Sequence, residues 1–289
     1  MSIFRSTYNA SDVIYDLHSH TTASDGSLDP DSLIAYAAEC GVDVLAITDH
    51  DTLDAFERVD GSASGTRLLT GVELSTTWNR IGIHVVGLDI DPRDRMLCDG
   101  VKQQKAGRIE RARTIAERLQ KLGIPVPLDD VLEIAGDACV GRPHFAEHLV
   151  ATGICRDTKT AFRKYLGAGK VGDVRQGWAA LTDVVQWITS AGGTAVLAHP
   201  VKYGLTKSKT RALAMDFRSA GGHAIEVVCG TQSETTTNHL ARLATELGLA
   251  ASCGSDFHAP GFAWSRPGGF PPLPAGVRPV WETWQTPWT

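Results

Sequence analysis

The sequence contains no long hydrophobic run, no paired cysteines and no excess of basic charge. A membrane-spanning helix needs about 20 consecutive apolar residues, and runs such as residues 195–198 are far shorter. The six cysteines form no C-x-x-C pair, which argues against a zinc ribbon or a dithiol redox motif. The net charge of -5 is unsuited to binding long DNA by phosphate neutralisation.

The composition is otherwise that of an ordinary globular protein, with 43% hydrophobic residues among 289. This length fits either one α/β barrel or two modest domains. Residues 1–9 lack the apolar core of a secretory signal peptide. We therefore expect a cytoplasmic protein with no membrane association.

Short runs rich in Val, Ile and Leu alternate with helical patterns, which predicts a parallel α/β sheet closed, or nearly closed, into a barrel. The seven predicted strands span residues 13–17, 44–48, 68–74, 83–90, 194–198, 224–228 and 250–254. The predicted helices span residues 30–40, 181–191, 207–219 and 233–247. Glycines suited to left-handed helix caps follow at positions 41, 192, 221 and 248.

Helical periodicity replaces the strand pattern between residues 91 and 172 and predicts an inserted helical subdomain. We place this helical insert at residues 99–172, between barrel segments 1–98 and 173–289. Its first helix has an apolar face formed by Ile109, Ala112, Ile115, Ala116, Leu119 and Leu122. A basic stripe on the same helix comprises Lys102, Lys105, Arg108 and Arg111. Such a stripe is usually solvent-exposed. The Trp-rich tail from residue 260 is expected to close the barrel.

Six histidines and three carboxylates lie at or near the ends of the predicted strands. They are His18, His20, Asp25, His50, Glu73, His84, His199, Asp256 and His258. Any one of them alone would more often be a structural residue, but the strand ends of an α/β barrel converge on one mouth. A buried cluster of this kind would be costly unless cations compensated it. Imidazoles and carboxylates without thiolates favour zinc, manganese or iron. Two or three such ions sharing a carboxylate suit phosphate-ester hydrolysis.

The motifs as a set resemble the polymerase and histidinol phosphatase (PHP) superfamily of metal-dependent phosphoesterases. The resemblance runs through residues 16–20, 24–26, 47–51, 71–73, His84, 198–200 and 254–258. It implies a distorted seven-stranded (β/α) barrel with a trinuclear metal centre. It also implies three groups of ligands: His18, His20, Glu73 and Asp256; Glu73, His84 and His199; and Asp25, His50 and His258.

The chain looks most similar to stand-alone family members that dephosphorylate 3′,5′-nucleoside bisphosphates or trim short RNA from its 5′ end. The similarity includes residues 141–144 and 165–167 of the insert and 273–276 of the tail. It implies that Arg142 and His144 hold a substrate phosphate, and a guanidinium fork suits phosphate well. Lys170 is a further candidate, although the residues after it depart from the family pattern.

The resemblance implies hydrolysis by a metal-activated hydroxide, with His199 or His258 as a possible proton relay. The expected partners are small phosphorylated substrates such as nucleoside bisphosphates, and short RNA. An alternative enzyme is a histidinol-phosphate phosphatase or another small-molecule phosphomonoesterase. A different class of function is a catalytically inactive metal-binding module.

Overall fold

The computed structural model describes residues 13–60, 65–174, 177–261 and 266–284. The strands are β1 (Tyr15–Asp16), β2 (Val44–Ile47), β3 (Arg67–Trp78), β4 (Ile81–Leu88), β5 (Thr194–Leu197), β6 (Ala224–Cys229) and β7 (Ala250–Gly254). The barrel helices are α1 (Pro30–Cys40), α2 (Ala55–Arg58), α7 (Leu181–Ser190), α8 (Lys207–Ser219) and α9 (Glu234–Leu247), with a short 3-10 turn at Pro200–Tyr203. The N-terminal residues 1–9 lie outside the described residues.

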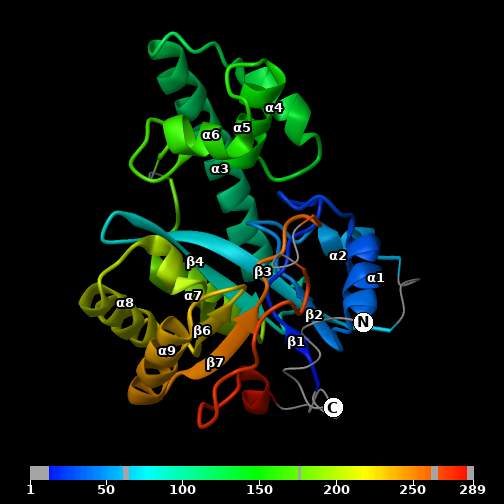
Figure 1. The fold of residues 1–289 in the computed structure, drawn as a ribbon, viewed down its shortest axis with the longest axis vertical. Helices are drawn as coiled ribbons and strands as arrows, with labels where there is room; N and C mark the ends of the chain where they lie inside the picture. Colours follow the sequence, from blue (N-terminus) through cyan, green and yellow to red (C-terminus); the bar gives the residue numbers. More distant parts are fainter. Residues whose placement is uncertain (1–12, 61–64, 175–176, 262–265, 285–289) are drawn as a thin grey trace.

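The seven strands form one sheet in chain order from β1 to β7. Backbone hydrogen bonds join its two edges, because Leu17 donates to Cys253 at 3.1 Å and Asp256 donates to His18 at 2.9 Å. Helices α1 and α2 cover one side, while α7, α8 and α9 cover the other (Figure 1). The predicted distorted seven-stranded barrel is confirmed.

The prediction of a wholly parallel sheet is wrong at β4, which runs antiparallel to both β3 and β5. Strands β3 and β4 are joined by Asn79 and Arg80, which both have positive φ, at 47° and 66°. Two such residues make the hairpin turn whose twist matches antiparallel strands. A parallel connection needs a dozen or more residues. The hairpin also extends β3, so Glu73 lies within its strand rather than at the end.

The ends of the barrel helices carry capping residues, including the predicted glycines. Asp29 accepts a hydrogen bond from the Ser32 amide at the start of α1, where Pro30 occupies the first turn. Gly41 ends that helix with φ 82°, a conformation that costs glycine little. The other predicted cap glycines, at positions 192, 221 and 248, also have positive φ.

The helical insert is carried on the long helix α3 (Arg95–Lys121), which rises from the barrel (Figure 1). Its further elements are α4 (Leu128–Ala135), α5 (Arg142–Ala151), α6 (Thr158–Ala161) and a π-helical turn at Phe162–Leu166. A separate hydrophobic cluster that includes Leu119, Val131 and Phe145 holds them together. Because α3 runs through residue 98 without a break, the domain boundaries stay a prediction.

Two details of the predicted α3 surface are wrong. Ile109 and Leu122 are 37% and 59% exposed, so they do not belong to the apolar face. Within the basic stripe, Lys102 is solvated as expected, but Arg108 is buried. Arg108 is buried because Asp51 of the barrel and the Val140 carbonyl of the insert both bind its guanidinium.

The described part of the tail packs against the first residues of β1 and β5 and so closes the barrel, as predicted. Trp281 stacks on Tyr15 with ring centroids 4.1 Å apart, and Trp284 donates its indole N–H to Thr194 Oγ1 at 3.0 Å. A short 3-10 turn at Val280–Thr283 carries the first of these rings. The tail tryptophans at positions 264 and 288 lie outside the described residues.

Candidate metal centre and substrate cleft

Glu73 is the centre of the candidate site. Its Oε1 lies 2.9 Å from His84 Nδ1 and 2.8 Å from His199 Nε2. Its Oε2 lies 3.1 to 3.3 Å from ring nitrogens of His18, His20 and His50. The side chain is fully buried. One carboxylate therefore faces five imidazoles, which is the geometry expected of a bridging ligand.

Asp256 and Asp25 complete the cluster on two sides. Asp256 Oδ1 lies 3.2 Å from His20 Nε2 and 3.6 Å from His18 Nε2. Asp25 Oδ1 lies 3.4 Å from His258 Nε2, and its Oδ2 lies 3.9 Å from His50 Nε2. The structure thus brings together all nine residues predicted as ligands, in overlapping groups whose donor atoms lie within 4.8 Å of one another.

The donor atoms fit divalent cations. Buried atoms of the cluster that lack a hydrogen-bond partner among the described residues are His18 Nε2, both ring nitrogens of His20, His50 Nδ1, Glu73 Oε2 and His199 Nδ1. Leaving such atoms unpaired in a protein interior costs about 1–3 kcal/mol each. Nitrogen and carboxylate oxygen are ligands that zinc, manganese and iron accept. The cluster is therefore able to bind metal ions.

The cluster is also electrostatically coupled. Burial alone would raise the pKa of Glu73, but the imidazoles of His50, His18 and His84 hold it well below its usual range. Burial lowers the pKa of His50 well below its usual value. Burial also opposes protonation of His18, but Glu73, Glu226 and Asp256 raise the pKa of His18 well above its usual value, so a metal ion that binds this imidazole would have to displace a proton.

Glu226 on β6 supports the cluster from behind and escaped the sequence analysis. Its Oε1 lies 3.0 Å from His18 Nδ1, and its Oε2 accepts the backbone N–H of His199 at 2.6 Å. When His18 donates its Nδ1 proton to Glu226, the lone pair remains on Nε2, the nitrogen that faces Glu73. Hydrogen-bond partners of this kind fix the tautomer and orientation of metal-binding histidines. The sequence did carry a signal for Glu226, because it is the one charged residue in an otherwise apolar strand. A charged side chain is rarely buried without a partner, so its position predicts a buried partner nearby.

Two residues of the 3-10 turn after β5 brace the cluster on another side. Lys202 forms an ion pair with Asp256 Oδ2 and leaves Oδ1 to face the histidines. The Tyr203 hydroxyl accepts the His84 amide N–H and donates to the Ala198 carbonyl, both at 2.9 Å. Both side chains border the substrate cleft.

A buried ion pair ties the insert to the barrel. Arg108 Nε donates to Asp51 Oδ2 at 2.7 Å, and Asp51 directly follows His50 in the chain. The other Asp51 oxygen accepts the Ser75 amide at 2.7 Å. Part of the predicted basic stripe is therefore a structural link beside the cluster.

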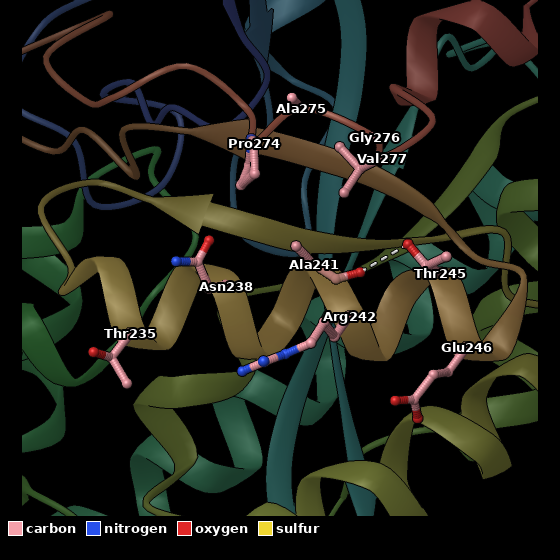
Figure 2. A pocket seen from close by; sticks show the side chains of 10 residues that line it. All are labelled: Thr235, Asn238, Ala241, Arg242, Thr245, Glu246, Pro274, Ala275, Gly276 and Val277. Carbon is pink, nitrogen blue, oxygen red and sulfur yellow. Dashed lines mark hydrogen bonds between the residues drawn. The ribbon is translucent and has the colours of Figure 1, made fainter.

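A cleft of about 540 Å³ lies between the cluster and the insert. The barrel contributes residues of the cluster and of the 3-10 turn to its lining: Asp25, His50, His84, His199, Lys202 and Tyr203. The other side of the cleft is formed by α3, the rest of the insert and the segment after it, which contribute Arg108, Arg111, Arg142, Asp173 and Trp178, among others. Another hollow, of about 650 Å³, lies between α9 and residues 274–277 (Figure 2). Its charged lining residues are Arg242 and Glu246, and none of the cluster residues borders it. The chemistry belongs to the first cleft.

Comparison with known proteins agrees with this geometry. Residues 16–97 match the family model of the PHP domain. The 5′-3′ exoribonuclease Rnm of Escherichia coli K12 is 43% identical over 95% of each chain. The chain belongs to the PHP family. The 3′,5′-nucleoside bisphosphate phosphatase of Chromobacterium violaceum is 42% identical over 92% of this chain and 95% of its own.

A solved structure gives the same result for the fold. An amidohydrolase from Chromobacterium violaceum, with bound sulfate and no metal, matches with a TM-score of 0.85 and 41% identity. The match covers 93% of this chain and 95% of that one. This PHP protein is an enzyme of the phosphoesterase family. Among its described residues, no helix is long and apolar enough to cross a membrane.

The three predicted phosphate-binding residues of this PHP enzyme lie in different settings. Arg142 borders the cleft, and its Nη1 donates to the Leu166 carbonyl at 3.1 Å. His144 is buried, and its Nδ1 accepts the Gly141 amide N–H at 2.9 Å, which caps α5. Lys170 is exposed and is not among the residues that line the cleft. The geometry therefore favours Arg142 over the other two.

Proposed function

We propose that this protein is a metal-dependent phosphoesterase that removes phosphate from 3′,5′-nucleoside bisphosphates and nucleotides from the 5′ end of short RNA. The observation that carries the proposal is one cleft that joins a histidine–carboxylate cluster to the guanidinium of Arg142. The printed activities of the two relatives, a nucleoside bisphosphate phosphatase and a 5′-3′ exoribonuclease, support this substrate class. We also propose that it works in the cytoplasm.

The proposed ligands are the nine cluster residues, for two or three ions of manganese, zinc or iron. Glu73 would be the ligand shared between ions, because each of its oxygens faces a different set of imidazoles. Bound divalent ions would neutralise phosphate charge and lower the pKa of water toward about 7. Arg142 is then the proposed contact for substrate phosphate on the opposite wall.

Of the two residues predicted as a proton relay, the geometry favours His258 over His199. The His258 side chain is 36% exposed, whereas His199 is 7% exposed with Nε2 against Glu73. A histidine cannot coordinate a metal and move a proton through the same nitrogen, so ligation and relay are alternatives for His258 Nε2. The metal content of His258→Gln separates them, since only loss of a ligand lowers it.

The function is tested by comparing turnover of adenosine 3′,5′-bisphosphate, a short 5′-phosphorylated RNA and histidinol phosphate by the metal-loaded enzyme. We expect the two nucleotide substrates to be preferred by kcat/KM. The strongest turnover on histidinol phosphate would instead establish the alternative phosphatase. Full metal content without turnover of these three or of a generic aryl phosphate would establish an inactive metal-binding module.

A further inference from the structure

We propose that a hollow at the end of the barrel opposite the metal cluster is a second binding site, which takes the phosphate group of small phosphorylated compounds. The hollow has a volume of about 710 Å³, within the range of small-molecule sites in proteins. Its lining includes Arg218, His223, Arg278 and Trp284. It shares no residue with the catalytic cleft or with the nine cluster residues, so the inference stands apart from the proposed function.

The strands of the barrel place this hollow far from the cluster. Thr194 is the first residue of β5, and His199 follows the end of the same strand. Five residues of extended chain cover about 16 Å. The hollow is also bordered by Asp89, just after β4, and by His223 and Leu249, just before β6 and β7. It therefore lies at the strand ends on the side of the tail, whereas the insert lies at the other end of the molecule (Figure 1).

Two arginines of this hollow lack a carboxylate partner among the described residues. Arg218 lies in the last turn of α8, and Arg278 belongs to the tail. Neither guanidinium forms an ion pair or a hydrogen bond in the part of the chain that the structure describes. Carbonyl groups at the ends of α8 and α9 are already bound by glycine amides, because Gly221 donates to the Arg218 carbonyl at 3.0 Å and Gly248 donates to the Thr245 carbonyl at 3.1 Å. The guanidinium donors therefore remain available to phosphate oxygens, which they bind in pairs.

The acid among the lining residues, Asp89, leaves this charge in place. Burial alone raises the pKa of its carboxyl group, and no nearby cation lowers it. Neither arginine is therefore close enough to be neutralised by Asp89. The described lining carries more positive than negative charge, and a hollow of this kind attracts anions.

His223 adds a donor that the backbone fixes. Its Nδ1 accepts the Ala195 amide N–H at 3.1 Å, and burial lowers the pKa of the imidazole. A neutral imidazole carries one proton, so Nε2 is the donor here. Trp284, whose indole N–H binds Thr194 Oγ1, places an aromatic ring at the same hollow. Because aromatic rings stack on nucleobases, the lining suits a nucleoside monophosphate as well as inorganic phosphate, and both are products of the reaction proposed above.

The test measures binding to the full chain by isothermal titration calorimetry, with inorganic phosphate and adenosine 5′-monophosphate as separate probes. Both the Mn²⁺-loaded and the metal-stripped protein are titrated, because binding in this hollow needs no metal. Combining Arg218→Gln with Arg278→Gln should raise the Kd for both probes about 10- to 100-fold, the effect of losing charge-assisted hydrogen bonds. Arg242→Gln is the matched control, because Arg242 is an exposed arginine on α9 that borders the other hollow (Figure 2). It should bind as wild type.

A variant that gains affinity separates the site from a loss of folding. Asp89→Asn removes the negative charge from the lining, and asparagine tolerates the positive φ of 55° at this position. It should bind both probes about 2- to 5-fold more tightly, the size of a screened charge interaction, which a damaged fold would not produce.

The two probes distinguish the sources of the phosphate group. Tighter binding of the nucleotide would identify a nucleoside monophosphate as the ligand, and equal Kd values would identify the phosphate group alone; both results support the site. An unchanged Kd in the double variant, an equal loss in Arg242→Gln, or binding only in the presence of Mn²⁺ would overturn it.

Discussion

Replacing Glu226 by glutamine tests how strongly the cluster depends on a residue that is not itself a proposed ligand. The carboxylate accepts from His18 Nδ1 and from the His199 amide, and it is 3% exposed. Glutamine has nearly the same volume, but its amide group can accept only one of these bonds and turns N–H donors toward the other. One buried donor is then unsatisfied, which costs about 1–3 kcal/mol of folding stability.

The same substitution should weaken metal binding by about 10- to 100-fold, the usual effect of losing the hydrogen-bond partner of a metal-binding histidine. The assay is metal content by elemental analysis after dialysis against buffers of graded free Mn²⁺, with urea unfolding of the metal-free protein in parallel. Glu117→Gln, an exposed carboxylate on α3, is the control. Unchanged metal affinity in Glu226→Gln would refute the argument that Glu226 orients His18.

Three further outcomes are expected. Glu73→Gln should lose more bound metal by elemental analysis than any single histidine variant, because Glu73 contacts five imidazoles; a greater loss in His84→Gln would contradict its bridging role. Arg108→Met should lower the free energy of unfolding in urea by about 3–5 kcal/mol, since Asp51 is left buried and unpaired, and a loss below about 1 kcal/mol would contradict this. The affinity of a catalytically dead form for 5′-phosphorylated RNA should stop rising once the RNA is a few nucleotides long. The slope of log affinity against log salt concentration should be no steeper than about -2, which corresponds to one to three phosphate contacts. A slope that steepens with RNA length would reveal an extended RNA-binding surface.

Much of the fold could be predicted because its signals are local. The barrel helices begin and end close to their predicted bounds, where Asp29, Pro30 and Gly41 satisfy or terminate the backbone hydrogen bonding of α1. The residues of the histidine–carboxylate cluster were predictable for a related reason. Strand ends such as those before His18 and His50 carry polar groups next to apolar runs, and barrel topology brings strand ends together.

The direction of β4 was also open to prediction and was missed. Only eight residues separate the predicted strands 68–74 and 83–90, too few for a parallel crossover. The correct inference was a hairpin turning at Asn79 and Arg80. Length of connection, rather than hydrophobic pattern, carried that information.

By itself the sequence determined the strand and helix order, the barrel class and the identity of the nine cluster residues, because these follow from short-range patterns and one topological rule. The tertiary structure alone decided which residues of α3 face the cleft. Arg108 and Arg111 belong to the same stripe as the solvated Lys102, but only the fold places Asp51 and Trp178 against them. Periodicity specifies a face of a helix, whereas the charge and shape of whatever packs on that face come from residues far away in the chain.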